Sequence, residues 1–165
     1  MTSKPYFKYS PDPKLAALAK SWEGTPFHPH MATRGVGVDC VWLAAELYRE
    51  TGALDVFDPP GYSIDGGHHC DASKVVAWVE ASGRFVLVSD APRAGDLVCF
   101  KIGKTIHHVG VMLDESRFSH AVARYGVMVS YLAEAAYGKR LAAVYRPTAR
   151  SMDETQPIVL PGGMV

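Results

Sequence analysis

Cys40 stands where a cysteine can act as a nucleophile. It follows the flexible run Gly35-Val36-Gly37-Val38 and lies at the start of a helix predicted over residues 39–50. A cysteine reacts as its thiolate, and the dipole and unpaired N–H groups at the start of a helix stabilise negative charge on sulfur. The same N–H groups can hold an oxyanion during attack on a carbonyl. A buried, inert cysteine is the alternative for a lone Cys at this position.

Two histidines supply the base that such a thiol needs. Alternation within the predicted strands 107–113 and 117–122 allows two adjacent antiparallel strands to present His108 and His120 side by side. One imidazole then serves as the base and the other orients it. Gly110 leaves room beside His108, and the close approach of a backbone or helix is one reason for glycine in a strand. The spacing therefore predicts a Cys–His pair with a second histidine behind it.

Helical patterns precede strand patterns along the chain. Apolar residues recur at helical spacing between Asp12-Pro13 and Gly24, throughout residues 39–50, and again over residues 71–82. The period then changes to two, and turn signals separate the short runs, which is typical of an antiparallel sheet. This order predicts an α+β fold with N-terminal helices packed on an antiparallel sheet. The predicted strands cover residues 85–88, 97–102, 107–113, 117–122, 126–131 and 141–145.

The composition is that of one globular domain. The chain has 165 residues, of which 48% are hydrophobic and 21% charged, with 17 basic and 17 acidic side chains. This balance lacks the basic excess of a nucleic-acid-binding protein, and no apolar run reaches the length of a membrane span. Three cysteines do not make a disulfide framework, and the polar N-terminus predicts no signal peptide, so we expect synthesis in a reducing compartment. We expect a domain over residues 1–147 and a flexible tail over residues 148–165.

Several short motifs, in matching order and spacing, resemble the NlpC/P60 cysteine peptidases. They are Trp22-Glu23-Gly24-Thr25-Pro26-Phe27, Gly37-Val38-Asp39-Cys40, Ala94-Gly95-Asp96-Leu97, His108-Val109-Gly110-Val111 and Phe118-Ser119-His120-Ala121. The resemblance extends over residues 15–146 and is greatest to short members encoded with phage tails or gene-transfer particles. It implies a papain-like α+β fold in which Cys40 is the nucleophile, His108 the base and His120 the group that orients the base.

The resemblance also implies a substrate and a place of action. The implied substrate is the stem peptide of bacterial peptidoglycan, cut at an amide bond between a D-glutamate, linked through its side chain, and a diamino acid. The implied route is synthesis in the cytoplasm and delivery to the periplasm or cell wall by a phage-like particle, with tail or gene-transfer particle proteins as partners. We expect no cofactor and no metal ion, and neither nucleic acid nor membrane as a partner.

Two departures from the family pattern bear on substrate contacts. The family has small residues after the nucleophile (Cys-Ser-Gly-Leu), whereas this chain has Val41 and Trp42, and the family's Pro-Tyr pair is Pro26-Phe27 here. A residue as large as Trp42 must occupy space against the sheet or the cleft. We expect Phe27, Asp39 and Trp42 to contact the substrate.

Three other functions fit parts of the sequence. His68, His69 and Cys70 lie together and offer ligands for zinc, although the chain has no C-x-x-C or H-x-x-x-H spacing. A catalytically retired module would bind cell-wall peptide or a tail partner without cutting it. A related acyltransferase or amidase would act on a small amide, because a thioester intermediate can pass to water or to another nucleophile.

Overall fold

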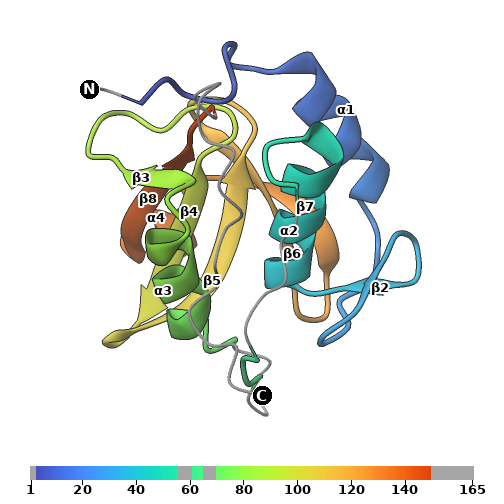
Figure 1. Cartoon of the computed structure of the whole chain (residues 1–165). Coiled ribbons are helices and arrows are strands. Elements are labelled where there is room, and N and C mark those ends of the chain that lie inside the picture. The colour runs from blue at the N-terminus through green and yellow to red at the C-terminus, as the bar shows by residue number, and fades with distance from the viewer. Residues whose placement is uncertain (1–2, 56–60, 65–69, 150–165) are drawn as a thin grey trace, which may run out of the picture.

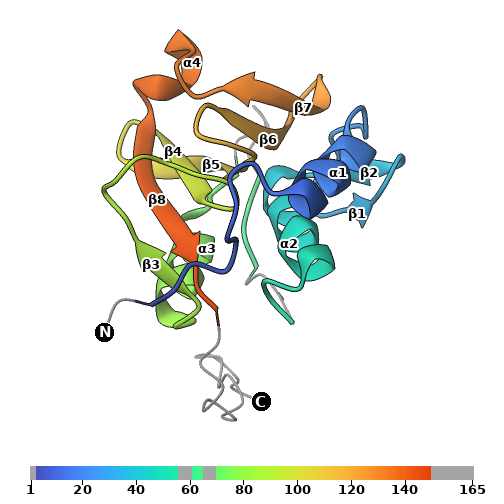
Figure 2. The ribbon, with the colours of Figure 1, turned by 90° about the horizontal axis from the view of Figure 1, so that it is seen from above.

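The fold joins a helical layer to one six-stranded antiparallel sheet (Figures 1 and 2). The structure is a computed structural model that describes residues 3–55, 61–64 and 70–149. In Figure 2, α1 and α2 lie together on one side of the sheet and α4 lies on the other. The helices are α1 (Pro13–Trp22), α2 (Cys40–Thr51), α3 (Ser73–Ala81) and α4 (Ala135–Gly138). The strands are β1 (Ala32–Thr33), β2 (Gly37–Val38), β3 (Phe85–Leu87), β4 (Leu97–Ile102), β5 (Thr105–Met112), β6 (Arg117–Val122), β7 (Gly126–Tyr131) and β8 (Leu141–Pro147).

The sheet has the strand order β3-β8-β4-β5-β6-β7, and every neighbouring pair is antiparallel. This confirms the predicted α+β class, with three helices before the sheet. The strands β4, β5, β6 and β7 follow one another through short turns. The last residues of β4 and β6 and the first residues of β5 and β7 therefore lie at the same end of the sheet. That end of the sheet carries the functional site. Within the described residues, no helix is both long and apolar enough to cross a membrane.

The helices α1 and α2 begin at aspartate side-chain caps, whereas α3 and α4 have no side-chain cap. Asp12 accepts a hydrogen bond from the Leu15 N–H at 2.9 Å, and Pro13 fills the first position of α1, as its missing N–H favours. The third helix begins at Ser73, two residues later than predicted, because the Asp71 carboxylate accepts hydrogen bonds from the N–H and hydroxyl of Ser73 outside the helix.

Other boundaries also differ from the predictions. Residues 25–38, which lie between the first two predicted helices and outside every predicted strand, contain the short ribbon of β1 and β2, and α4 was not predicted. The strand β5 begins at residue 105 rather than 107, because Ile102 pairs with Thr105 across a two-residue turn in which Gly103 has a φ of +64°.

The ordered domain extends past the predicted boundary at residue 147. The N–H groups of Thr148 and Ala149 donate to the carbonyls of Arg84 and Lys4, each at 2.9 Å, so these two residues belong to the domain and not to the tail. The rest of the predicted tail, residues 150–165, lies outside the described residues.

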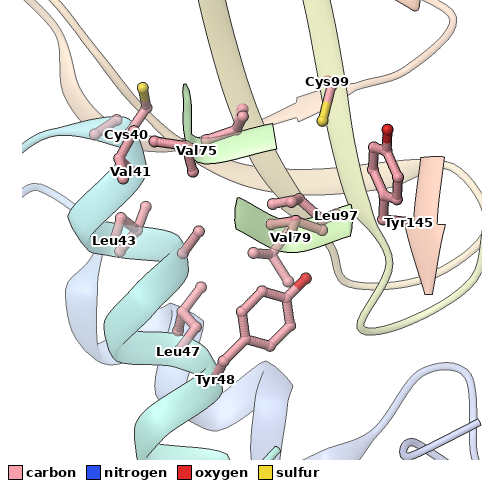
Figure 3. Close-up of a cluster of buried hydrophobic side chains, with 14 of the residues drawn as sticks. Cys40, Val41, Leu43, Leu47, Tyr48, Val75, Val79, Leu97, Cys99 and Tyr145 are labelled. Carbon is pink, nitrogen blue, oxygen red and sulfur yellow. The ribbon is translucent and has the colours of Figure 1, made fainter. Parts of the chain in front are cut away.

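The main core lies between the helices and one face of the sheet (Figure 3). Val41 and Tyr48 of α2 face Val79 of α3 and Leu97 of β4. Eight of the twelve residues of α2 are buried, as expected for a helix that is apolar nearly all round. Alternation along the strands directs a second set of side chains to the opposite face. This smaller cluster contains Val98, Phe100, Met112, Phe118 and Val144.

The Ala94-Gly95-Asp96-Leu97 motif is part of the scaffold. The buried carboxylate of Asp96 accepts two hydrogen bonds from the Arg146 guanidinium, at 2.9 and 2.8 Å, and so holds the start of β4 to the end of β8. Gly95 has a φ of +90°, and the Phe7 ring occupies the space that its Cβ would need. The motif therefore fixes the sheet that carries the site, at a distance from the site itself.

Candidate active site

Cys40 is the first residue of α2, and its side chain lies on the wall of a cleft. Only 2% of the residue is exposed, so its thiol faces the cleft and little else. Asp39 caps the helix: one carboxylate oxygen, Oδ1, accepts a hydrogen bond from the Trp42 N–H at 2.9 Å. The N-terminal end of a well-formed helix therefore points at the cysteine sulfur, as the sequence predicted.

The second carboxylate oxygen of Asp39 organises the loops around α2. It accepts hydrogen bonds from the His30 N–H at 2.7 Å and from the Tyr62 hydroxyl at 2.6 Å. His30 has a φ of +57°, and its ring packs against Tyr62 with 4.7 Å between centroids. Burial and the negative charge on Cys40 raise the pKa of Asp39, and its three hydrogen bonds oppose that rise. The side chain of Asp39 thus serves the scaffold of the site.

Cys40 is the thiol most readily ionised. A hydrogen bond with the Cys70 thiol, followed by the hydrogen bond and charge of His108 and the Val109 N–H, holds the pKa of Cys40 well below its usual value against the opposing effect of burial. The same hydrogen bond, together with burial, raises the pKa of Cys70. We place the thiolate on Cys40, because it alone stands at a helix N-terminus beside an imidazole. Burial raises the pKa of Cys99 to about 12, which leaves that thiol inert.

A chain of hydrogen bonds extends from the base into the sheet. His108 Nε2 lies 2.8 Å from His120 Nδ1, and His120 Nε2 lies 2.9 Å from the Ser130 hydroxyl oxygen. His108 is half-buried, whereas His120 and Ser130 are 0% and 2% exposed. The three side chains come from β5, β6 and β7, so three neighbouring strands hold the base in place.

The second histidine is neutral, and its protonation can be assigned. Burial, with the charge of His108 adding to it, lowers the pKa of His120 to about 2. When His108 carries a proton on each nitrogen, its Nε2–H donates to His120 Nδ1. The one proton of His120 then lies on Nε2 and is donated to Ser130. This arrangement orients His108 and leaves its other nitrogen, Nδ1, for the thiol.

The two histidines meet where the sheet opens. Backbone pairing between β5 and β6 is confined to two residue pairs in the described chain, and beyond them the imidazoles of His108 and His120 bridge the strands. Gly110 lies at this point. A Cβ there would lie 2.7 Å from the Phe118 ring, so the predicted close approach at this glycine is that of an aromatic side chain from the neighbouring strand.

A cleft of about 410 Å³ opens at this end of the sheet, and both Cys40 and His108 line it. Its walls come from the loop after α1, the start of α2, the adjoining parts of β4, β5 and β6, the β6–β7 turn, and α4 with the residue before β8. The thiol and the imidazole are therefore accessible to a substrate from one side. The lining residues are Phe27, Cys40, Phe100, Ile102, His107, His108, Ala121, Val122, Ala123, Arg124, Ala136, Tyr137 and Arg140.

Comparison with known proteins identifies the family. Residues 21–146, which contain the whole site, match the model of the NlpC/P60 family. The chain belongs to this family. An Escherichia coli protein named murein DD-endopeptidase MepS/murein LD-carboxypeptidase is 28% identical over 130 residues, which are 79% of this chain and 60% of that protein. The chain thus spans about 60% of the length of the curated relatives it matches.

Solved structures of NlpC/P60 proteins share the fold. An NlpC/P60 family protein from Bacillus cereus aligns over 86% of this chain and 42% of its own, with a TM-score of 0.60 and 20% identity. The NlpC/p60 domain of the peptidoglycan hydrolase SagA aligns over 82% of this chain and 97% of its own, with a TM-score of 0.52 and 21% identity. These likenesses confirm the papain-like α+β fold that the motifs implied.

Of the three residues predicted to contact the substrate of this NlpC/P60 chain, one lines the cleft and two do not. Phe27 lines the cleft, as expected. Asp39 does not, because its carboxyl is fully buried and occupied by three protein donors. Trp42 does not either, because this half-buried residue of α2 packs against the main core. The predicted direct contact with substrate is thus supported by position for Phe27 alone.

Sequence reasoning missed Ser130 and Cys70 as members of the site. Ser130 shares a face of β7 with Met128, which pairs with His120, and this alternation is the signal that could have identified it. No local signal identifies Cys70, since its contact with Cys40 depends on the path of the chain before α3.

The zinc alternative concerns residues that are only partly described. His68 and His69 lie outside the described residues, and Cys70 contacts the thiol of Cys40. Among residues 3–55, 61–64 and 70–149, no group of three His, Cys, Asp or Glu side chains is arranged to hold a metal ion.

Proposed function

We propose that this NlpC/P60 protein is a cysteine peptidase that hydrolyses an amide bond in the stem peptide of bacterial peptidoglycan. The observation that carries the proposal is the position of His108, which lies in the same cleft as Cys40 and is held from behind by the neutral His120. A nucleophile, a base and a group that orients the base are the parts that acyl transfer through a covalent intermediate requires.

The reaction begins at the thiolate. Cys40 Sγ attacks the carbonyl carbon of the scissile amide, and the carbonyl electrons move to oxygen. The Trp42 and Leu43 N–H groups already donate to Asp39, so the oxyanion is left to the N–H groups of Cys40 and Val41 at the open end of α2. When the oxyanion collapses, the C–N bond breaks and the His108 imidazolium gives its proton to the leaving amine.

Water completes the cycle. The acyl group is now a thioester on Cys40, and the neutral His108 accepts a proton from a water molecule as that water attacks the thioester carbonyl. Breaking the C–S bond returns the thiolate and releases a carboxylic acid. His120 stays neutral throughout, because its pKa lies far below that of a free imidazole.

The choice of substrate rests on the relatives. The Escherichia coli relative is named a murein endopeptidase, and one structural neighbour is named a peptidoglycan hydrolase. The cleft opens on one side of the molecule and has an apolar wall formed partly by Phe27, Phe100 and Tyr137, which suits an extended peptide.

The test is to digest purified sacculi and to determine product masses. Wild-type protein should release fragments whose masses identify one amide bond, and Cys40→Ala should release none. Adding a primary amine distinguishes hydrolysis from acyl transfer, since a transferase would yield products heavier by the amine. If wild-type protein releases no product from sacculi, the substrate class is wrong.

Delivery by a phage-tail or gene-transfer particle is also a proposal, and it rests on the likeness of the motifs to short particle-encoded members. Fractionation of particles from the source strain tests it. The protein should co-purify with intact particles, and its recovery only from particle-free cytoplasm would contradict this route.

A further inference from the structure

The cleft contains two positive charges that the proposed chemistry does not use. Arg124 lies in the turn between β6 and β7, and Arg140 lies between α4 and β8. Both line the cleft that holds Cys40 and His108, and both are exposed. In the part of the chain that the structure describes, neither guanidinium makes an ion pair or a side-chain hydrogen bond. The two charges are therefore available to a ligand.

The rest of the described cleft lining does not neutralise these charges. It contains no aspartate or glutamate, and apart from the histidines and the thiol its walls are apolar or aromatic. A ligand that fits such a surface carries a negative charge at each end of an otherwise uncharged segment, or one negative charge shared by both arginines. The planar guanidinium matches a carboxylate in two parallel hydrogen bonds.

The backbone at Arg124 points to the same role. The turn is closed by a hydrogen bond from the Tyr125 N–H to the Val122 carbonyl at 3.1 Å, and Arg124 has a φ of +72°. Adopting this left-handed conformation costs a residue that has a Cβ on the order of 1 kcal/mol of conformational free energy relative to glycine. A large cationic side chain is held in a conformation that glycine or asparagine would adopt with less strain, as happens at ligand-binding positions.

We propose that Arg124 and Arg140 form a carboxylate-binding subsite, which selects peptides that carry a free carboxylate next to the scissile amide. The assignment rests on the proposed function for its role in catalysis. The subsite itself rests only on the cleft and its charges. Its ligand is an acidic peptide, and an uncharged peptide of the same length is the substrate that it discriminates against.

The first test needs no hydrolysis. Cys40 is alkylated with iodoacetate, which is anionic, and with iodoacetamide, which is neutral, at low ionic strength, and the modified cysteine is located by peptide mass mapping. The quantity compared is the alkylation rate with iodoacetate divided by the rate with iodoacetamide. We expect Arg124→Gln and Arg140→Gln each to lower this ratio by about twofold or more. Lys139→Gln is the matched control, because Lys139 is an exposed cation next to Arg140 that does not line the cleft. Its ratio should equal that of the wild type.

The second test uses hydrolysis. Two stem peptides are compared that differ only in having free carboxyl groups or the corresponding carboxamides beside the scissile bond. Each arginine variant should raise KM for the carboxylate peptide by about tenfold or more and leave the carboxamide peptide unchanged. Arg124→Lys and Arg140→Lys should recover part of the loss, because they keep the charge and lose the paired hydrogen bonds.

The outcomes separate the two proposals. An iodoacetate ratio that stays the same in both arginine variants overturns the carboxylate subsite, and so does an equal loss of rate on the two peptides. If the wild type cuts neither peptide while the alkylation ratio falls as expected, the proposed function is wrong and the carboxylate subsite stands.

Discussion

His108 and His120 face each other across the point where β5 and β6 stop pairing, with 2.8 Å between Nε2 and Nδ1. A side-chain hydrogen bond thus continues the connection between two strands whose backbones no longer pair. The opening gives the thiol at the start of α2 access to the imidazole. The same hydrogen bond orients that imidazole, because the buried His120 can accept only on Nδ1 while its proton is donated to Ser130.

Ser130 should matter for the rate of the reaction more than for binding. Ser130→Ala removes the acceptor for the His120 N–H and weakens the preference for the tautomer that holds His108. We expect kcat to fall by roughly 10-fold with little change in KM, as for loss of a hydrogen bond worth about 1.4 kcal/mol in the transition state. The measurement is kcat, KM and the pH–rate profile of the wild type and of Ser130→Ala.

Ser119→Ala is the matched control for that change. Ser119 is equally buried on β6, but its hydroxyl has no hydrogen-bond partner among the described residues. Removing it should leave kcat unchanged and should not lower stability. If Ser119→Ala and Ser130→Ala have the same effect on kcat, the hydrogen bond from His120 has no positioning role.

The buried His120 should make the protein less stable in mild acid. Its pKa is about 2 in the folded protein, whereas that of an unfolded histidine is about 6.5, so below pH 6.5 only the unfolded chain takes up this proton. The contribution of His120 to the free energy of unfolding is fully present above pH 6.5. It falls by about 2 kcal/mol between pH 7 and pH 5. Urea denaturation of wild type and His120→Asn at both pH values measures the difference.

A smaller pH dependence in His120→Asn is the result that supports this assignment. If the two proteins lose the same free energy of unfolding between pH 7 and pH 5, then His120 is protonated in the folded state. That result would also remove the argument that fixes its tautomer.

The sequence alone could predict the residues that short-range patterns determine. A helix start identifies Cys40, and strand alternation places His108 and His120 on facing positions, which the structure confirms by their hydrogen bond. The hydrogen bond of Ser130 was not predicted, because a diagonal contact between strands depends on register, and register depends on turns that propensities do not fix.

Contacts that depend on chain path were beyond reach of the sequence. Cys70 lies 30 positions from Cys40, and only the route of the chain before α3 brings the two thiols together. Asp39 was predicted to touch substrate, yet a carboxylate at that position is also the natural cap of α2, a role that the start of the helix in the sequence already indicates. The second oxygen accepts hydrogen bonds from His30 and Tyr62, and these two contacts depend on the path of the loops and have no local sequence signal.

Asp39 should be more important for stability than a typical helix cap. Asp39→Ala leaves the Trp42 N–H, the His30 N–H and the Tyr62 hydroxyl without their acceptor in a buried place. We expect a loss of about 3 kcal/mol or more in the free energy of unfolding. The comparison is Asp12→Ala, which removes a half-buried cap of α1 and should cost only about 1 kcal/mol. Equal losses would show that the second oxygen of Asp39 contributes nothing.

Activity should not depend on a metal ion. The proposed steps need only Cys40, His108 and backbone N–H groups, so EDTA should leave hydrolysis intact and a thiol alkylator should abolish it. Hydrolysis is measured on sacculi after dialysis against chelator. Loss of activity in EDTA with recovery on adding zinc would instead favour the metal-site alternative.

The reactivity of Cys40 towards iodoacetamide should depend on Cys70 as well as on His108. Both side chains lower the pKa of Cys40, Cys70 through the hydrogen bond that is the largest single cause and His108 through a hydrogen bond and its charge. The alkylation rate of Cys40 should therefore rise through an inflection well below the roughly 8.5 of a free thiol. In Cys70→Ala and in His108→Ala the inflection should move to higher pH, while Cys70→Ser, which keeps a donor, should move it less. Cys99→Ala is the control, because that buried thiol makes no hydrogen bond with Cys40 and its removal should leave the inflection in place. An inflection that moves in His108→Ala but not in Cys70→Ala would mean that the imidazole alone stabilises the thiolate and that Cys70 is a bystander.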